Sequence, residues 1–432
     1  MAVVAEHPTM TRAQPARIDR ELIAALPKSD LHVHLDGSLR IETLIELARA
    51  RGLPLPSATA AGLRETVFKH SYENLPDYLK GFELTVACLQ DAESLERGAY
   101  ELCIDCYAEN VLYVELRFAP QLHVQGGFDL RQVMAAVAAG MARAKREIDA
   151  DPEIRAGRRP RFECGIIVCA LRFFLPQFSQ HYRTFFEALP NAPREQIYAL
   201  ASLELARAAV RAIDEDGLPV VGFDLAGQER GFPAQAHAAA YQLVHDHFLG
   251  ATVHAGEDYG PESIFQAITD CHADRIGHGT WLFSADRIQD ASIVDREAYV
   301  EKLVRYVADR RITLEVCLTS NQQTIPELRD DLSKHPFRKM RDAKVSTALC
   351  TDNRLVSRTT ITDEVVKAVE VFGLSPTELK DVLIYGFKRS FVPGPYHVKR
   401  SYVRQVLDAM ERLFLARGID VRPGPRGPGE PG

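Results

Sequence analysis

Eight short apolar runs recur along the chain, and the stretches between them are long enough to hold helices. Runs of this length bounded by polar residues indicate buried β-strands. Strands that alternate with helices predict a parallel sheet, and eight such units predict a (β/α)₈ TIM barrel, an α/β fold. The expected strands are 31–35, 111–118, 164–171, 220–225, 251–253, 275–277, 313–318 and 345–349.

The chain is longer than a barrel requires. It has 432 residues, whereas a typical (β/α)₈ barrel needs about 250, so we expect extra helices over the C-terminal mouth. The first connection, 38–110, has room for them. One helical stretch within it carries an apolar face made of Leu75, Tyr78, Leu79 and Phe82. Such a face is typical either of ordinary core packing or of a lid over the mouth.

The two ends of the chain differ from the rest. Residues 1–20 mix Pro, Thr, Arg and Ala without periodicity, so we expect a disordered N-terminal extension. Residues 419–432 are rich in Pro and Gly, and we expect a disordered tail there. The remaining segment, 21–418, is predicted to form one domain, the barrel.

Composition excludes several classes of protein. A hydrophobic share of 46% and a charged share of 26% fit a globular protein. The net charge of −7 gives no support for a nucleic-acid surface. No apolar run reaches the roughly 18 residues of a membrane span, and the N-terminus lacks the apolar core of a secretory signal. Eight scattered cysteines are typical of reduced thiols, so we expect a cytoplasmic protein, of open oligomeric state.

Metal-ligand side chains stand at the ends of three strands. His32 and His34 are two residues apart on the first, so both side chains point to the same face. His254 ends the fifth strand, and Asp352 follows the eighth, where a buried carboxylate is costly unless it is paired or bound to metal. Because the carboxyl ends of barrel strands converge, these residues predict a single-metal site. The structural alternatives are core histidines and a helix-capping aspartate.

Two further groups are expected beside this site. Glu257 follows the fifth strand, and Gly256 lets the backbone bend, so the carboxyl can reach a metal's open position as an acid or base. His278 lies between two glycines at the end of the sixth strand, where it could orient or deprotonate a metal-bound water. The structural alternatives are a capping glutamate and a satisfied core histidine.

The ligand set favours zinc. Three imidazoles and one carboxylate with an open position suit Zn²⁺, although nickel, cobalt or iron could take the same ligands. No lysine lies in 220–227 to bridge two ions, so we expect one zinc per chain. The chain has no G-x-S-x-G elbow, no P-loop and no G-x-G-x-x-G after a strand. It also lacks the H-x-E…P-C-x-x-C signature of the cytidine-deaminase fold. The pattern therefore predicts a metallohydrolase.

Six ordered blocks resemble the adenosine deaminase family, over about residues 22–415. The blocks are SDLHVHLDG (29–37), DLAG (224–227), VHAGE (253–257), RIGHG (275–279), CLTSN (317–321) and TDN (351–353). The resemblance implies a zinc enzyme that uses water to remove the 6-amino group of adenosine or 2′-deoxyadenosine. The products would be inosine or deoxyinosine and ammonia, which places the enzyme in purine salvage with a small nucleoside as its partner.

The resemblance also implies catalytic roles. Glu257 would pass a proton to N1 of the purine, while His278 and Asp352 would position the attacking water. The implied zinc ligands are His32, His34, His254 and Asp352.

Substrate contacts follow from the same resemblance. Gly227 would donate its backbone N–H to N3, and Asp36, near His34, would hold the ribose hydroxyls. His34 is expected to contact the substrate as well as the metal. The family's apolar gate over the purine is matched by Leu75, Tyr78, Leu79 and Phe82.

Two positions depart from the family pattern. The family usually has a second aspartate after the zinc-binding one, donating to N7, and this chain has Asn353 there. N7 only accepts, so a carboxyl group must be protonated to donate to it, whereas an amide donates at any pH. Asn353 is thus compatible with a 6-aminopurine but leaves the base preference open. Leu318 replaces the usual proline, and we expect it to change local rigidity rather than chemistry.

Three hypotheses about function follow. Adenosine deamination leads, and the second keeps the mechanism for adenine, a modified adenosine or another amino-heterocycle. Asp36 favours a neutral ribose over a 5′-phosphate, because a carboxylate repels phosphate. The third is a non-catalytic binding protein with this fold, against which the complete ligand set, Glu257 and His278 all argue.

Overall fold

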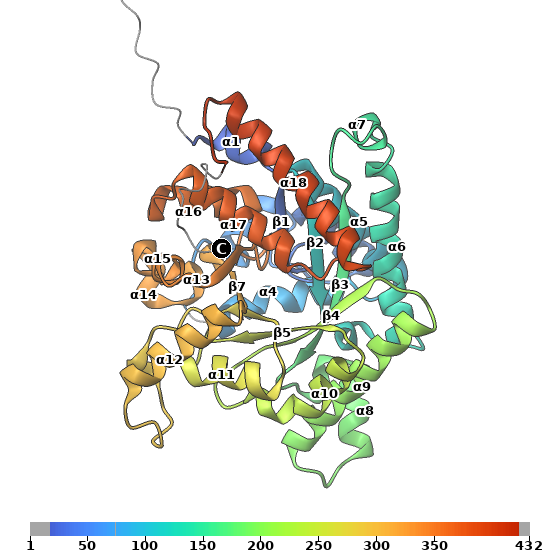
Figure 1. The fold of residues 1–432 in the computed structure, drawn as a ribbon. Coiled ribbons are helices and arrows are strands. Elements are labelled where there is room, and N and C mark those ends of the chain that lie inside the picture. Colours follow the sequence, from blue (N-terminus) through green and yellow to red (C-terminus); the bar gives the residue numbers. More distant parts are fainter. Residues whose placement is uncertain (1–17, 74, 423–432) are drawn as a thin grey trace, which may run out of the picture.

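The computed structural model of the chain describes residues 18–73 and 75–422. Eight parallel strands follow one another in chain order, so the predicted (β/α)₈ barrel is confirmed (Figure 1). One expected strand runs too far, because Leu318 begins helix α13 (Leu318–Thr324). The strands are β1 (Lys28–His34), β2 (Val111–Phe118), β3 (Glu163–Leu171), β4 (Val220–Ala226), β5 (Gly250–Ala255), β6 (Arg275–His278), β7 (Thr313–Val316) and β8 (Ser346–Leu349).

The ring of strands closes just beyond β8. Val33 and Asp352 form a parallel bridge between the first strand and the residues that follow the last. The backbone N–H of Asp352 donates to the carbonyl of His32 at 2.8 Å, and that of His34 donates to the carbonyl of Asp352 at 2.7 Å. These bonds hold three predicted metal ligands at one point of the barrel rim.

Helices cover the outside of the barrel, and polar caps mark where several of them begin. Asp91, Asp129 and Ser375 each form a capping box at a helix start. The helices besides α13 are α1 (Arg20–Ala25), α2 (Ile41–Arg51), α3 (Ala60–Thr66), α4 (Leu75–Cys88), α5 (Ala92–Ala108), α6 (Leu130–Ile148), α7 (Pro152–Arg155), α8 (Gln180–Ala188), α9 (Arg194–Asp214), α10 (Ala238–Asp246), α11 (Pro261–Asp270), α12 (Arg296–Asp309), α14 (Pro326–Arg329), α15 (Phe337–Asp342), α16 (Ile361–Phe372), α17 (Pro376–Arg389) and α18 (Tyr396–Ala416).

Extra helices fill the connection between β1 and β2, as expected. One of them, α4, reaches the C-terminal mouth, since its Tyr78 hydroxyl lies 2.6 Å from the Ser357 hydroxyl beyond β8. No helix within 18–73 and 75–422 is both long and apolar enough to cross a membrane.

The barrel domain extends farther at both ends than predicted. Helix α1 begins at Arg20 with Asp19 as its cap and packs against α16 and α18, so residues 18–20 belong to the fold (Figure 1). Ile419 and Val421 are buried in the main core, so 419–422 belong to it as well. Both segments are too short for their periodicity to be recognised. The rest of the expected disordered ends, 1–17 and 423–432, lies outside the described residues.

Candidate active site

Four predicted metal ligands come together at the carboxyl ends of β1, β5 and β8. One ligand atom from each of His32, His34, His254 and Asp352 lies within 4.8 Å of the others. The Nε2 atoms of His34 and His254 are 3.2 Å apart, and Asp352 Oδ1 is 3.5 Å from Nε2 of both His32 and His34. Four ligands about 2.1 Å from a tetrahedral ion would stand roughly 3.4 Å apart, so the spacing fits one cation.

Two of the imidazoles are oriented by carboxylates behind them. His32 Nδ1 lies 2.8 Å from Glu315 Oε2, and His254 Nδ1 lies 3.1 Å from Asp224 Oδ2. These partners favour a proton on Nδ1, so the Nε2 lone pairs face the centre of the site. Nε2 of His32 is buried without a hydrogen-bond partner, a cost that a bound metal ion would remove.

Arg117, on β2, joins these two carboxylates. Its guanidinium lies 2.9 Å from Asp224 Oδ2 and 2.8 Å from Glu315 Oε2, and all three side chains are fully buried. Burial alone would raise the pKa of both carboxyls, yet their positive neighbours, Arg117 among them, hold both pKa values below the ordinary range. Both groups therefore stay ionised behind the imidazoles.

The buried charges of this network leave a negative excess. Arg275 also reaches Glu315, but it is paired with Glu115 and so adds little net charge. Arg117 is then the one remaining guanidinium set against three carboxylates. A divalent cation would supply the missing charge, which is a second reason why the residues fit a metal. The three carboxylates that lie against the imidazoles are Asp224, Glu315 and Asp352.

His278 lies beside the imidazoles of His32 and His254, with ring centroids 5.1 and 5.3 Å away, and carries its proton on Nε2. Asn321 Nδ2 lies 3.1 Å from His278 Nδ1, and Asn321 Oδ1 accepts from the Thr280 hydroxyl, so the amide donates to Nδ1. The ring proton is then on Nε2, and burial lowers the pKa of His278 well below its usual value. A neutral ring in this state can orient a water by donating to it, but it cannot deprotonate that water at Nε2.

Glu257 faces His278 with a carboxyl suited to hold a proton. Its Oε2 is 3.6 Å from His278 Nε2, and its side chain is 12% exposed. Burial raises the pKa of Glu257 well above its ordinary value, and the Asp352 and Glu229 carboxylates raise it further. A protonated carboxyl can act as an acid toward a bound base.

The expected substrate contacts follow the carboxyl ends of β1, β4 and β8. Asp36 is 3% exposed, its Oδ1 has no hydrogen-bond partner, and burial raises its pKa to about 7. Gly227 has φ +95, and a Cβ there would meet only the backbone nitrogen of Arg172 at 3.8 Å, which leaves open space beside it. Asn353 Nδ2 donates to the Tyr78 hydroxyl at 2.7 Å, and its Oδ1 has no partner.

The four expected gate residues take different positions. The Phe82 and His34 rings meet edge to face, with their centroids 6.3 Å apart. Tyr78 is buried but serves as a polar anchor, bonded to Asn353, rather than as an apolar shield. Leu79 does not join a buried gate, since it is 37% exposed. The side chain of Leu75 lies outside the described residues.

Comparison with known proteins identifies the family. A profile described as "Adenosine deaminase" matches residues 27–408. The chain belongs to the adenosine deaminase family of hydrolytic deaminases. It is 35% identical over 376 residues to an adenosine deaminase of Mycobacterium sp. (strain JLS), covering 86% of this chain and 92% of that one. The resemblance proposed from the six blocks is confirmed.

Two further proteins are similar to this chain over most of its length. A probable adenosine deaminase of Dictyostelium discoideum is 31% identical over 407 residues and covers 94% of this chain, which spans 45% of that protein's length. The crystal structure of the Arabidopsis N6-mAMP deaminase is 26% identical, with a TM-score of 0.67, and covers 90% of this chain and 99% of that chain. The proteins similar to this chain therefore carry names that differ in substrate.

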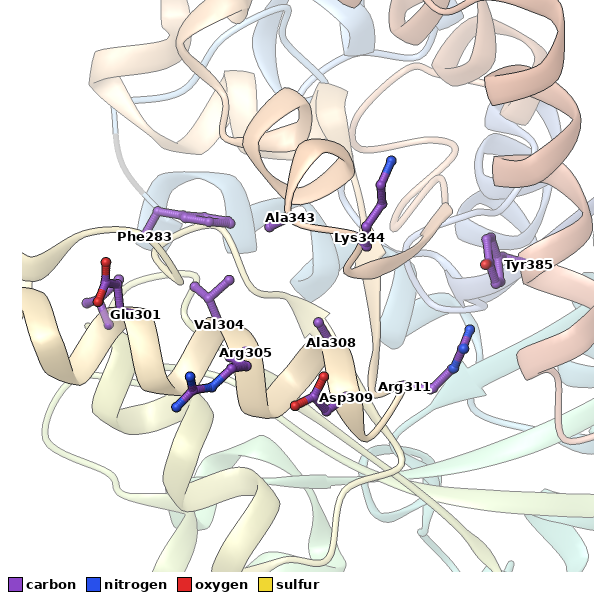
Figure 2. A pocket seen from close by; sticks show the side chains of 11 residues that line it. Phe283, Glu301, Val304, Arg305, Ala308, Asp309, Arg311, Ala343, Lys344 and Tyr385 are labelled. Atoms are coloured by element: carbon purple, nitrogen blue, oxygen red, sulfur yellow. The ribbon is translucent and has the colours of Figure 1, made fainter. Parts of the chain in front are cut away.

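A surface cleft of about 750 Å³ lies elsewhere, along α12 and beside Tyr385 of α17 (Figure 2). None of the metal-ligand or substrate-contact residues lines it. Because its charged residues have both signs, it offers no consistent field for a charged ligand. These residues are Glu301, Asp309, Arg305, Arg311 and Lys344.

Removing Arg117 should strongly destabilise the fold. In Arg117→Met the carboxylates of Asp224 and Glu315 stay buried without their shared cation, which should cost about 3–5 kcal/mol. Chemical denaturation measures the loss. The matched control is Arg40→Met, since Arg40 pairs with Asp105 at the surface and should contribute about 1 kcal/mol or less. Equal effects of the two substitutions would show that the buried network is not stabilising.

Proposed function

We propose that this protein is a zinc-dependent adenosine deaminase that converts adenosine or 2′-deoxyadenosine, with water, to inosine or deoxyinosine and ammonia. The observation that carries the proposal is the meeting of a four-ligand metal group with Glu257, whose pKa is raised, in one buried site. Family membership supports the same reaction. The activity would place the protein in cytoplasmic purine salvage.

The metal would supply the nucleophile, and Glu257 would supply a proton. When bound, zinc would lower the pKa of a water ligand toward neutrality and supply the nucleophile for C6. The protonated Glu257 carboxyl would donate to N1, which makes C6 more electrophilic. Of the two protons of the attacking water, one would return to Glu257 and the other would go to the 6-amino group, which then leaves as ammonia while the C6 carbonyl forms. His278 would hold the attacking water by donating from Nε2, since its Nδ1 accepts from Asn321.

Three groups would position the nucleoside. The open backbone at Gly227 would donate its N–H to N3. Asp36, whose buried Oδ1 lacks a partner, would accept from the ribose hydroxyls. Asn353 has two amide hydrogens, and Tyr78 takes one, so the other would be left for N7. Phe82 would exclude water above the purine.

A second candidate substrate is N6-methyl-AMP. The likeness to the Arabidopsis N6-mAMP deaminase, at 26% identity over 90% of this chain, favours it. Asp36 favours the unphosphorylated nucleoside: its pKa is raised to about 7, so part of this carboxyl is ionised near neutral pH, and the ionised form would repel a 5′-phosphate.

A substrate series tests this choice directly. We expect adenosine and 2′-deoxyadenosine to exceed adenine, AMP and N6-methyl-AMP in kcat/KM by at least about tenfold, or about 1.4 kcal/mol. Chromatography of the products and an ammonia assay measure turnover. A tenfold preference for N6-methyl-AMP or adenine would overturn the nucleoside assignment and leave the deaminase chemistry standing.

Metal content tests the cofactor. With four convergent ligands and no bridging lysine, we expect about one zinc ion per purified chain. Chelation should abolish deamination, and added zinc should restore it. Elemental analysis that finds two metal ions per chain, or a metal-free chain that keeps its activity, would contradict the proposal.

The departure at Asn353 gives a prediction about pH. Asn353→Asp should still deaminate adenosine, but its activity should fall toward higher pH as the introduced carboxyl ionises and repels the N7 lone pair. Burial and the adjacent Asp352 carboxylate should raise the pKa of that carboxyl above its ordinary value near 4, so the fall can occur near neutral pH. The measurement is kcat/KM for adenosine across pH in both proteins. Profiles of the same shape would show that position 353 does not contact N7.

A further inference from the structure

One buried carboxylate outside the metal group holds the loop that carries Glu257. Glu229, in the connection after β4, is 6% exposed. Its two oxygens accept backbone N–H bonds from four consecutive residues, over distances of 2.7 to 3.1 Å. The Ser263 hydroxyl also donates to it. The four backbone donors are Gly256, Glu257, Asp258 and Tyr259.

Consecutive amides that converge on one anion form a nest, a backbone arrangement with strong preference for negative charge. Gly256 makes this one possible, because its φ is +70 and a Cβ would lie 2.7 Å from Ile264. Among the described residues Glu229 forms no ion pair. Its negative charge is therefore compensated mainly by the amides of the Glu257 loop.

The carbonyl side of Glu257 is held separately. The indole N–H of Trp281 donates to the Glu257 carbonyl at 2.7 Å, and the backbone N–H of Trp281 donates to the Gly256 carbonyl at 3.0 Å. Arg287 stacks on the indole at 3.5 Å. The backbone N–H and the backbone carbonyl of Glu257 are thus both hydrogen-bonded, and the bond of the N–H depends on Glu229.

We propose that Glu229 is a positioning residue for deamination: its carboxylate holds the 256–259 loop so that the Glu257 carboxyl faces the site. The inference rests on the proposed role of Glu257 as the proton donor. Glu229 itself does not contact the metal group; it acts through the backbone. The negative charge of Glu229 also helps to raise the pKa of Glu257, which favours the protonated carboxyl that the proposed role requires.

The main test is Glu229→Gln, which keeps the side-chain volume. An amide has one acceptor oxygen and presents its NH₂ to the remaining backbone donors, so the loop should shift. We expect kcat to fall about 10²-fold, as for misplacement of a catalytic group by about 1 Å. KM and zinc content should change little. Ser263→Ala is the matched control: it removes one bond to the same carboxylate and should cost about fivefold or less.

A double-mutant comparison separates positioning from a general structural role. If Glu229 acts through Glu257, then adding Glu229→Gln to Glu257→Gln should lower kcat little further, whereas independent effects would multiply. Multiplying losses would overturn the proposal. So would a well-folded Glu229→Gln protein with a kcat near that of the wild type.

Chemical rescue gives a readout that does not depend on the Gln variant. Glu229→Ala leaves the nest amides free, so sodium formate should bind there and restore part of kcat. Wild type and Glu257→Gln in the same formate are the controls.

Trp281, the single tryptophan of the chain, reports the conformation of the loop: its fluorescence emission should shift in Glu229→Ala and return with formate. A kcat loss that formate does not recover, with unshifted emission, would overturn the proposal. Every comparison uses whichever purine the wild type turns over, so a wrong substrate assignment would be seen separately.

Discussion

The site depends on one buried contact, the bridge that Arg117 makes between Asp224 and Glu315. Each carboxylate orients one imidazole, so a single guanidinium sets the direction of His32 and His254 together. Three charges with no exposure are costly unless each is matched, and here each is bonded on two sides. This arrangement aims the histidine nitrogens at one point, which is the condition for a tetrahedral site.

Backbone strain is concentrated at the same place. Asp352 and His278 both adopt left-handed backbone conformations, with φ of +60 and +64. Such conformations cost about 1–3 kcal/mol each in residues other than glycine. At Asp352 the strain is held by two backbone bonds to β1, the bonds that also close the barrel. The same bonds therefore close the fold and hold Asp352, a candidate metal ligand, in place.

The extra helix α4 connects the cover of the site to Asn353, the residue proposed to contact the base. Tyr78 on that helix bonds to both Asn353 and Ser357, while Phe82 meets the His34 ring edge to face. A movement of α4 would therefore change the amide proposed to read N7 together with the shield above the purine. An ionised aspartate at position 353 has no hydrogen to donate, so it would accept a hydrogen bond from the Tyr78 hydroxyl and reverse the direction of the present bond.

The sequence by itself determined the strands, the residues of the candidate metal group and the family, because these follow from local rules: apolar runs form buried strands, and residues two apart on a strand share a face. It did not determine that Glu315 serves His32, across 283 positions, or that Asp224 serves His254. Charges within apolar runs were the available signal, but their pairing is decided by which strands become neighbours. Likewise Glu229 has no motif of its own, since its partners are backbone amides that only the folded loop brings together. Long-range pairing of polar groups is a property of the closed barrel, and no local pattern encodes it.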